Sequence, residues 1–280
     1  FTDAANNSMY THDVSGTDDT AQYNTAYGFT AMDAITTGDQ NTAVGYGAGG
    51  SLTTGTGNVS LGYRAGINLT TGHNNVAIGS NALLTEDGDG GNVAIGTSAL
   101  KDLNAGADAY NVAVGHAAGE NVTTGIRNVL IGGLAGDALT TGGNNIAIGY
   151  EALTTEDGDG RNIAIGTNSL QTLNAGSDAY NVAVGFASGA TMTTGVRNVI
   201  MGGLAADALT TGGYNIAIGY SALGTEDTGA KSVAIGYAAL GLQNYNGDAY
   251  NIAIGYSAGS EISTGINNTL IGGLAGDAIN

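Results

Sequence analysis

Acidic turns recur along the chain at a regular spacing, and their carboxylates could bind calcium. The two longer turns contain Glu86, Asp87, Asp89, Glu156, Asp157 and Asp159. Hard cations such as Ca²⁺ prefer oxygen ligands, and the interleaved glycines would let a loop wrap around the ion. The alternative is a solvated, charged turn that keeps the molecule soluble and prevents lateral aggregation. Apart from Ca²⁺, the sequence indicates no cofactor.

Aromatic residues recur directly after a repeated glycine and could stack on the sugar rings of a glycan. The tyrosines at this place are Tyr46, Tyr63, Tyr150, Tyr220, Tyr237 and Tyr256. Rigid rings with a polar edge are favoured anchors for binding. The alternative is that the rings pack over a bend of the chain or at a seam between chains.

Catalytic motifs are weak in this sequence, and we expect that the protein is not an enzyme. Gly255, Ser257 and Gly259 match the spacing of a serine-nucleophile elbow, but that elbow needs a strand–turn–helix and a His and Asp partner. Ala117 and Ala187 occupy the place of Ser257 in two earlier copies of the repeat. The three histidines do not recur in phase, so they do not indicate a metal cluster.

One short motif repeats along almost the whole chain, and it sets the expected architecture. It reads Asn, β-branched, Ala, β-branched, Gly, as in residues 75–79, and it occurs fifteen times from Asn24 to Asn268. Successive copies keep a 17-residue spacing except for three 19-residue steps, which recur once in each 70-residue unit of four copies. Glycine at a fixed place indicates positive φ or close backbone approach. The structural glycines expected on this basis are Gly79, Gly96, Gly115, Gly149, Gly166, Gly185 and Gly219.

The alternation of Val, Ala and Ile has a period of two, which predicts a β-strand with Val76 and Ile78 facing inward. A glycine bend, a short second strand and a Thr-Thr-Gly turn would complete one coil. The sequence therefore predicts an all-β parallel β-roll or β-solenoid of 17–19-residue rungs. Residues 24–280 would form fifteen rungs in 70-residue units of four, and residues 1–23 an irregular N-terminal cap or linker.

The middle alanine of the motif is replaced by a larger residue at one phase of the 70-residue unit, where Leu130, Ile200 and Leu270 stand. The replacement indicates either a widened core or a lateral contact.

Each rung is too narrow to bury much apolar surface, so we expect several copies of the chain to wind side by side. Columns of Ala, Leu and Gly would allow the close approach that such a seam needs. A closed threefold arrangement is the natural solution, which makes two further copies of the chain the expected partners.

Composition excludes several classes of protein. Six basic residues against 24 acidic ones give a net charge of −18, so a phosphate backbone would repel the chain and we expect no nucleic-acid partner. Without cysteine there is no disulfide framework. The sequence has no basic-then-apolar leader, and its apolar runs are far shorter than the ~20 residues that span a bilayer, so we expect no membrane insertion.

Residues 41–46 with Ala48, the Thr53–Gly55 turn and Asn58 resemble the repeat of bacteriophage tail fibres. The Val-Ala-Ile-Gly core is also similar to the head repeats of YadA-like trimeric autotransporter adhesins. Both resemblances cover residues 24–280, and both imply a homotrimeric, left-handed parallel β-roll. They imply an extracellular place, on a virion tail fibre or a bacterial surface, and attachment to a host-surface glycan or protein.

The 17-residue spacing with Thr-Thr-Gly favours the phage family, and the function we expect is a non-enzymatic structural and adhesive fibre segment. The alternatives are the head of a bacterial surface adhesin and the subunit of an extracellular structural filament. A polysaccharide-degrading tailspike would need paired carboxylates in a cleft, for which these rungs look too narrow.

Overall fold

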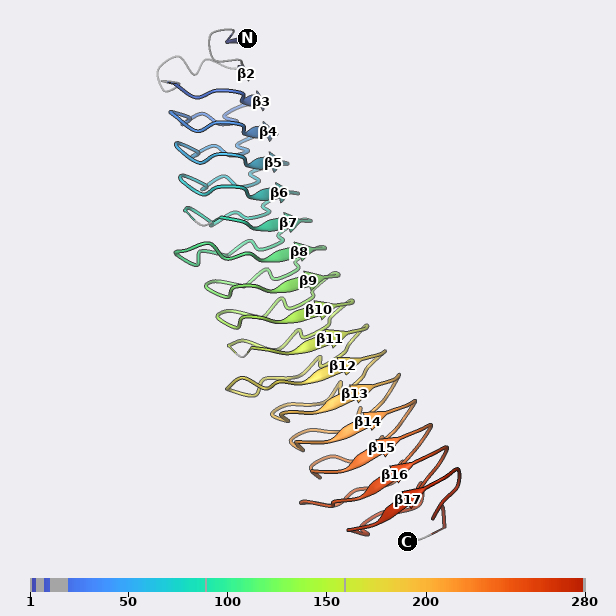
Figure 1. Ribbon diagram of the computed structural model, residues 1–280. Coiled ribbons are helices and arrows are strands. Elements are labelled where there is room, and N and C mark those ends of the chain that lie inside the picture. Colours follow the sequence, from blue (N-terminus) through green and yellow to red (C-terminus); the bar gives the residue numbers. More distant parts are fainter. Residues whose placement is uncertain (1, 4–7, 11–19, 89, 159, 279–280) are drawn as a thin grey trace. The chain divides into compact units, whose positions relative to one another are not determined.

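The computed structural model describes residues 2–3, 8–10, 20–88, 90–158 and 160–278. The chain divides into two compact units, residues 1–143 and residues 144–280. Each unit is a parallel β-solenoid in which one short strand per rung pairs with the strand of the next rung (Figure 1). The predicted all-β parallel solenoid with 17-residue rungs is therefore confirmed.

The first unit begins with an antiparallel pair, β1 (Thr2–Asp3) and β2 (Ser8–Tyr10), and continues from β2 as a parallel ladder. These two strands lie in the segment for which we expected an irregular cap. The rest of this ladder is β3 (Thr25–Tyr27), β4 (Thr42–Val44), β5 (Val59–Leu61), β6 (Val76–Ile78), β7 (Val93–Ile95), β8 (Val112–Val114) and β9 (Val129–Ile131).

The second unit is a parallel ladder of the same kind. Its strands are β10 (Ile146–Ile148), β11 (Ile163–Ile165), β12 (Val182–Val184), β13 (Val199–Met201), β14 (Ile216–Ile218), β15 (Val233–Ile235), β16 (Ile252–Ile254) and β17 (Thr269–Ile271). From β3 onward, each motif position in either unit pairs with the same position in the next rung, as Ala164 does with Ala183.

The expected inward face of the strands is wrong. Ala77 is fully buried, whereas Val76 and Ile78 on either side of it are only half-buried. The same holds along both ladders, since in none of strands β3–β17 is the first or third residue buried. The rung is so narrow that alanine fits its interior, and the β-branched side chains form an apolar surface outside. We call these first and third strand residues the outer stripe.

The predicted second strand is also wrong. Asn81 and Leu83 have φ of 57° and 51°, values that a β-strand does not allow. Hydrogen bonds nevertheless continue from rung to rung, as in Leu83 N–H to the Ala99 carbonyl at 3.0 Å. This half of the rung therefore consists of turns that hydrogen-bond to the neighbouring rungs.

The Ala, Leu and Gly columns do not form the expected seam between chains. Ala82 and Leu83 are fully buried inside the rung. The glycine column serves close approach between successive rungs of one chain, because a Cβ on Gly79 would lie 2.4 Å from the Gly96 carbonyl oxygen.

A ladder of buried asparagines runs through the interior at the first motif position. The backbone N–H of Asn75 donates to the side-chain oxygen of Asn58 at 2.9 Å, and the amide of Asn58 donates to the Gly72 carbonyl at 2.8 Å. Because each side chain links its own turn to the next rung, asparagine serves as a structural residue at this place.

The larger residues at the middle motif position belong to the core. Leu130 and Ile200 are fully buried, and Leu270 is half-buried in the last described rung. Glycine makes room for Leu130, since a Cβ on Gly119 or Gly136 would lie 2.6 or 2.7 Å from its methyl carbons. The widened-core interpretation is thus the correct one.

Candidate interaction surface

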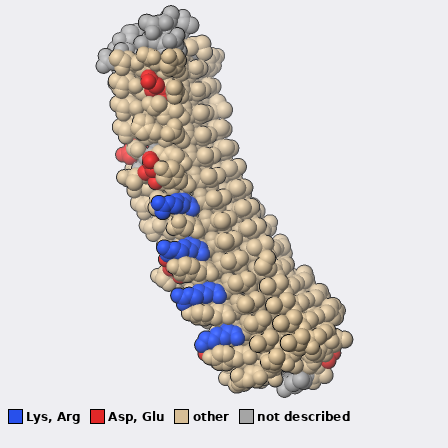
Figure 2. All heavy atoms as spheres, viewed as in Figure 1, with Lys and Arg blue, Asp and Glu red and all other residues tan. Residues whose placement is uncertain are grey.

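One column of residues lies at the backbone bend that leads into each strand, and we call it the leading column. It holds the residue directly before the motif, and all fifteen members have φ between 51° and 74°. Its members are Tyr23, Gln40, Gly57, Asn74, Gly91, Tyr110 and Arg127 in the first unit, and Asn144, Arg161, Tyr180, Arg197, Tyr214, Lys231, Tyr250 and Asn267 in the second. Four of the six Lys and Arg residues of the chain therefore lie in this column. Figure 2 shows basic side chains on the face of the molecule that it draws.

In the second unit the leading column alternates between cations and rings. The guanidinium of Arg161 lies 5.5 Å from the centre of the Tyr180 ring, and that of Arg197 lies 5.3 Å from the Tyr214 ring. Lys231 Nζ lies 5.3 Å from the centre of the Tyr250 ring. These distances are those of cation–π contacts, which hold the column in order from rung to rung.

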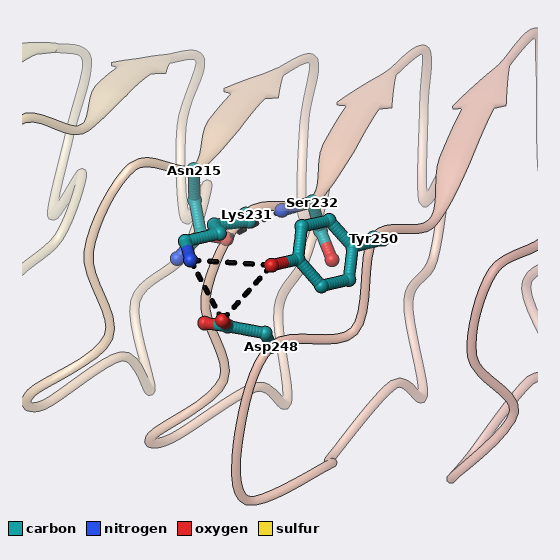
Figure 3. Close-up of polar contacts among 5 residues, drawn as sticks. All are labelled: Asn215, Lys231, Ser232, Asp248 and Tyr250. Carbon is teal, nitrogen blue, oxygen red and sulfur yellow. Dashed lines mark hydrogen bonds and ion pairs between the residues drawn. The ribbon is translucent and has the colours of Figure 1, made fainter.

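Two aspartates of the second unit accompany this column on the longer rungs. Asp248 accepts from Lys231 Nζ at 2.7 Å and from the Tyr250 hydroxyl at 3.1 Å, as Figure 3 shows. Asp178 forms the equivalent ion pair with Arg161. The hydrogen bond from Lys231 is the main cause that lowers the pKa of Asp248, and the same bond raises the pKa of Lys231. The cations of the column are thus partly neutralised.

A second column follows the motif glycine at the far end of each strand, and we call it the trailing column. It contains the six tyrosines for which glycan stacking was predicted, and all six are about half-exposed. Tyr46 lies between Phe29 and Tyr63 with ring centres 6.0 and 5.6 Å away, and Tyr237 lies between Tyr220 and Tyr256 at 5.6 and 5.2 Å. Because the rings stack along the rung direction, an inner ring offers a partner its edge and hydroxyl group, while its faces are occupied.

The acidic turns place their glutamates inside the rung. Glu86 and Glu156 are fully buried, while Asp87 and Asp157 are exposed. Asp89 and Asp159 lie outside the described residues. Among the residues that the structure describes, no group of three or more acidic or histidine side chains could hold a metal ion. Calcium binding stays a prediction from sequence.

The expected structural glycines share one geometry. Each has φ between 132° and 145°, and a Cβ would lie 2.2–2.5 Å from a backbone atom of the next rung. The set is Gly79, Gly96, Gly115, Gly149, Gly166, Gly185 and Gly219. No other residue fits this place without displacing the backbone.

Sequence reasoning singled out the trailing column and missed the leading column. The sequence signal for the leading column is the position of the basic residues. Lys and Arg are rare in this chain, and four of them directly precede the motif.

No helix in the described part of the chain has the length and hydropathy to cross a bilayer. Comparison with family models, curated proteins and solved structures finds nothing that matches this chain.

Proposed function

We propose that the protein is a non-catalytic structural and adhesive segment of a fibre, built from three copies of this chain. The observation that carries the proposal is the outer stripe. Its apolar side chains are half-buried or exposed in the single chain, and Met201, Ile252 and Ile254 reach 41, 37 and 36% exposure. Soluble proteins that act alone rarely expose a continuous apolar surface of this kind.

Three copies arranged around their outer stripes would remove this surface from water. Most rungs contribute two apolar side chains, with threonine at the first place only in β3, β4 and β17. Burial of apolar side chains stabilises an assembly by about 25 cal/mol per Å². The interior of a rung is stabilised separately, because leucines such as Leu83 and Leu100 are fully buried there beside the alanines. The assembly would therefore add to the stability that each chain has on its own.

The wider role is attachment to a host surface, as in a phage tail fibre, and it rests on the resemblance of the repeat. A regular solenoid with a rung repeat of ~4.8 Å is suited to hold a tip at a distance. A filament subunit would differ by forming long polymers, visible in negative stain.

Sedimentation equilibrium tests the assembly. We expect a particle of three chain masses, and Val184→Glu, which places a charge in the outer stripe, should give single chains or aggregates. Thr194→Glu adds the same charge at an exposed turn residue and should leave the three-chain mass unchanged. A wild-type protein that sediments as one folded chain would contradict the proposal. Binding of the labelled fibre to intact candidate host cells, compared with unrelated cells, tests attachment.

A further inference from the structure

The leading and trailing columns border the outer stripe on its two sides. In every rung the leading residue precedes the strand and the trailing residue follows the motif glycine. A three-residue strand alone separates them by about 10 Å, so they do not meet within a chain. The ring contacts described above accordingly join successive rungs of one column and never join the two columns.

The residue types of the two columns are nevertheless related in eight of the fifteen rungs. Every tyrosine of the leading column shares its rung with an aromatic residue of the trailing column. The pairs are Tyr23 with Phe29, Tyr110 with His116, Tyr180 with Phe186, Tyr214 with Tyr220, and Tyr250 with Tyr256. Every arginine of the leading column shares its rung with a small residue. These pairs are Arg127 with Gly133, Arg161 with Thr167, and Arg197 with Gly203.

We infer that the leading column of one copy packs against the trailing column of the next copy at the same rung, with the copies parallel and without axial displacement. This inference rests on the proposed assembly and specifies its contact. The paired residues are too far apart to touch within one chain. A contact between chains would explain why they correspond in size and type. A second copy is the partner that shares the same rung spacing over every rung.

Charge supports this pairing. The trailing column contains no Lys, Arg, Asp or Glu, so a leading column placed on it sets cations beside neutral rings. Leading columns placed on each other would set Arg and Lys against their own kind. The leading and trailing columns are therefore complementary to each other, and neither is complementary to itself. This is the condition for a head-to-tail contact that closes into a ring.

Gly203 illustrates the fit. In the trailing column it stands between Phe186 and Tyr220, which are 60 and 51% exposed. A Cβ at Gly203 would already lie 3.6 Å from the Tyr220 ring. A guanidinium from Arg197 of the neighbouring copy would enter at this missing side chain and lie between two rings, which is the arrangement that arginine favours.

Cysteine cross-linking tests the register, because the natural chain has no cysteine. Tyr214→Cys combined with Tyr220→Cys places thiols at the same rung of both columns, with β14 between them in one chain. We expect oxidation to yield a covalent three-chain species on a denaturing gel. Each single variant should yield none. The matched control, Tyr214→Cys with Tyr256→Cys, is displaced by two rungs, about 10 Å, which exceeds the Cα separation that a disulfide spans.

The outcomes separate the two proposals. Cross-linking in the displaced pair, cross-linking of a single variant, or a three-chain particle without a cross-link would each overturn the pairing and leave the assembly standing. If the wild type and the variants all sediment as folded single chains, both the assembly and the pairing would be overturned. Circular dichroism of each variant checks that the solenoid is folded.

Discussion

The side-chain amide of Gln243 donates a hydrogen bond to the hydroxyl oxygen of Ser232 at 3.0 Å inside the second unit. Gln243 also donates to Glu226 at 2.9 Å and accepts from Asn251 at 2.7 Å. At the corresponding places four rungs earlier, the chain has asparagine instead of Ser232 and leucine instead of Gln243. Two residues have thus changed together at this rung.

The earlier copy shows why the exchange is favourable. Asn162, which corresponds to Ser232, is fully buried, and its amide nitrogen has no hydrogen-bond partner among the described residues. Leu173, which corresponds to Gln243, cannot supply one. Serine removes the extra donor, and glutamine fills the space while satisfying Glu226 and Asn251.

We therefore expect Gln243→Leu to destabilise the protein, by about 1–3 kcal/mol for each buried polar group that loses its partner. Ser232→Asn added to Gln243→Leu recreates the pair found at Asn162 and Leu173, in which the buried amide nitrogen has no partner among the described residues, and should lower the stability further. Midpoints of urea unfolding measure both effects. A double variant at least as stable as Gln243→Leu would contradict this account.

Gly185→Ala should destabilise much more than Gly176→Ala. A Cβ on Gly185 would lie 2.5 Å from the Gly202 carbonyl oxygen, with φ at 142°. Gly176 has φ of 71° and no atom within 4 Å of its Cβ position, so alanine there has only the cost of the left-handed backbone, about 1 kcal/mol. For Gly185→Ala we expect a loss of at least ~3 kcal/mol. Equal unfolding midpoints for the two variants would contradict this account.

The repeat length and the strand position could be predicted from the sequence because Asn and Gly mark both ends of each strand. The face of each strand that lies inward could not be predicted. Alternation shows that Val76 and Ile78 share a face opposite Ala77, but it does not show which face is buried. The assumption that the larger apolar residues lie inside fails here because burial of apolar residues is only a tendency, and alanine takes the buried place in this narrow rung.

The leading column could not be predicted for a different reason. Its members include Tyr, Arg, Lys, Gln, Asn and Gly, which share no side-chain chemistry. What they share is the left-handed backbone, with φ of 54° at Tyr180 and 58° at Arg197. Glycine and asparagine indicate such a conformation in a sequence, whereas tyrosine and arginine do not.

The ion pair of Lys231 and Asp248 should make part of the free energy of unfolding depend on pH. The folded protein lowers the pKa of Asp248 below its ordinary value of 3.8, chiefly through the hydrogen bond from Lys231. The contribution is therefore present above pH 3.8 and is lost as the pH falls through the lowered pKa. In Lys231→Met the Asp248 pKa should rise toward 3.8, which a carboxyl NMR titration measures. Lys101→Met is the control and should leave Asp248 unchanged.

Leu130 and the glycines around it give a test of how the core is filled. Leu130→Ala should cost about 3 kcal/mol, because it removes a fully buried leucine. Gly136 has φ of 57° in this rung, and the corresponding place three rungs earlier holds Leu83 at φ of 51°, so leucine tolerates that backbone. The double variant Leu130→Ala with Gly136→Leu should therefore regain part of the lost stability by refilling the space from the other wall. Gly136→Leu alone should destabilise, since a Cβ there lies 2.7 Å from a Leu130 methyl carbon. Thermal midpoints for the four proteins complete the cycle, and additive effects of the two changes would show that the two side chains do not share one space.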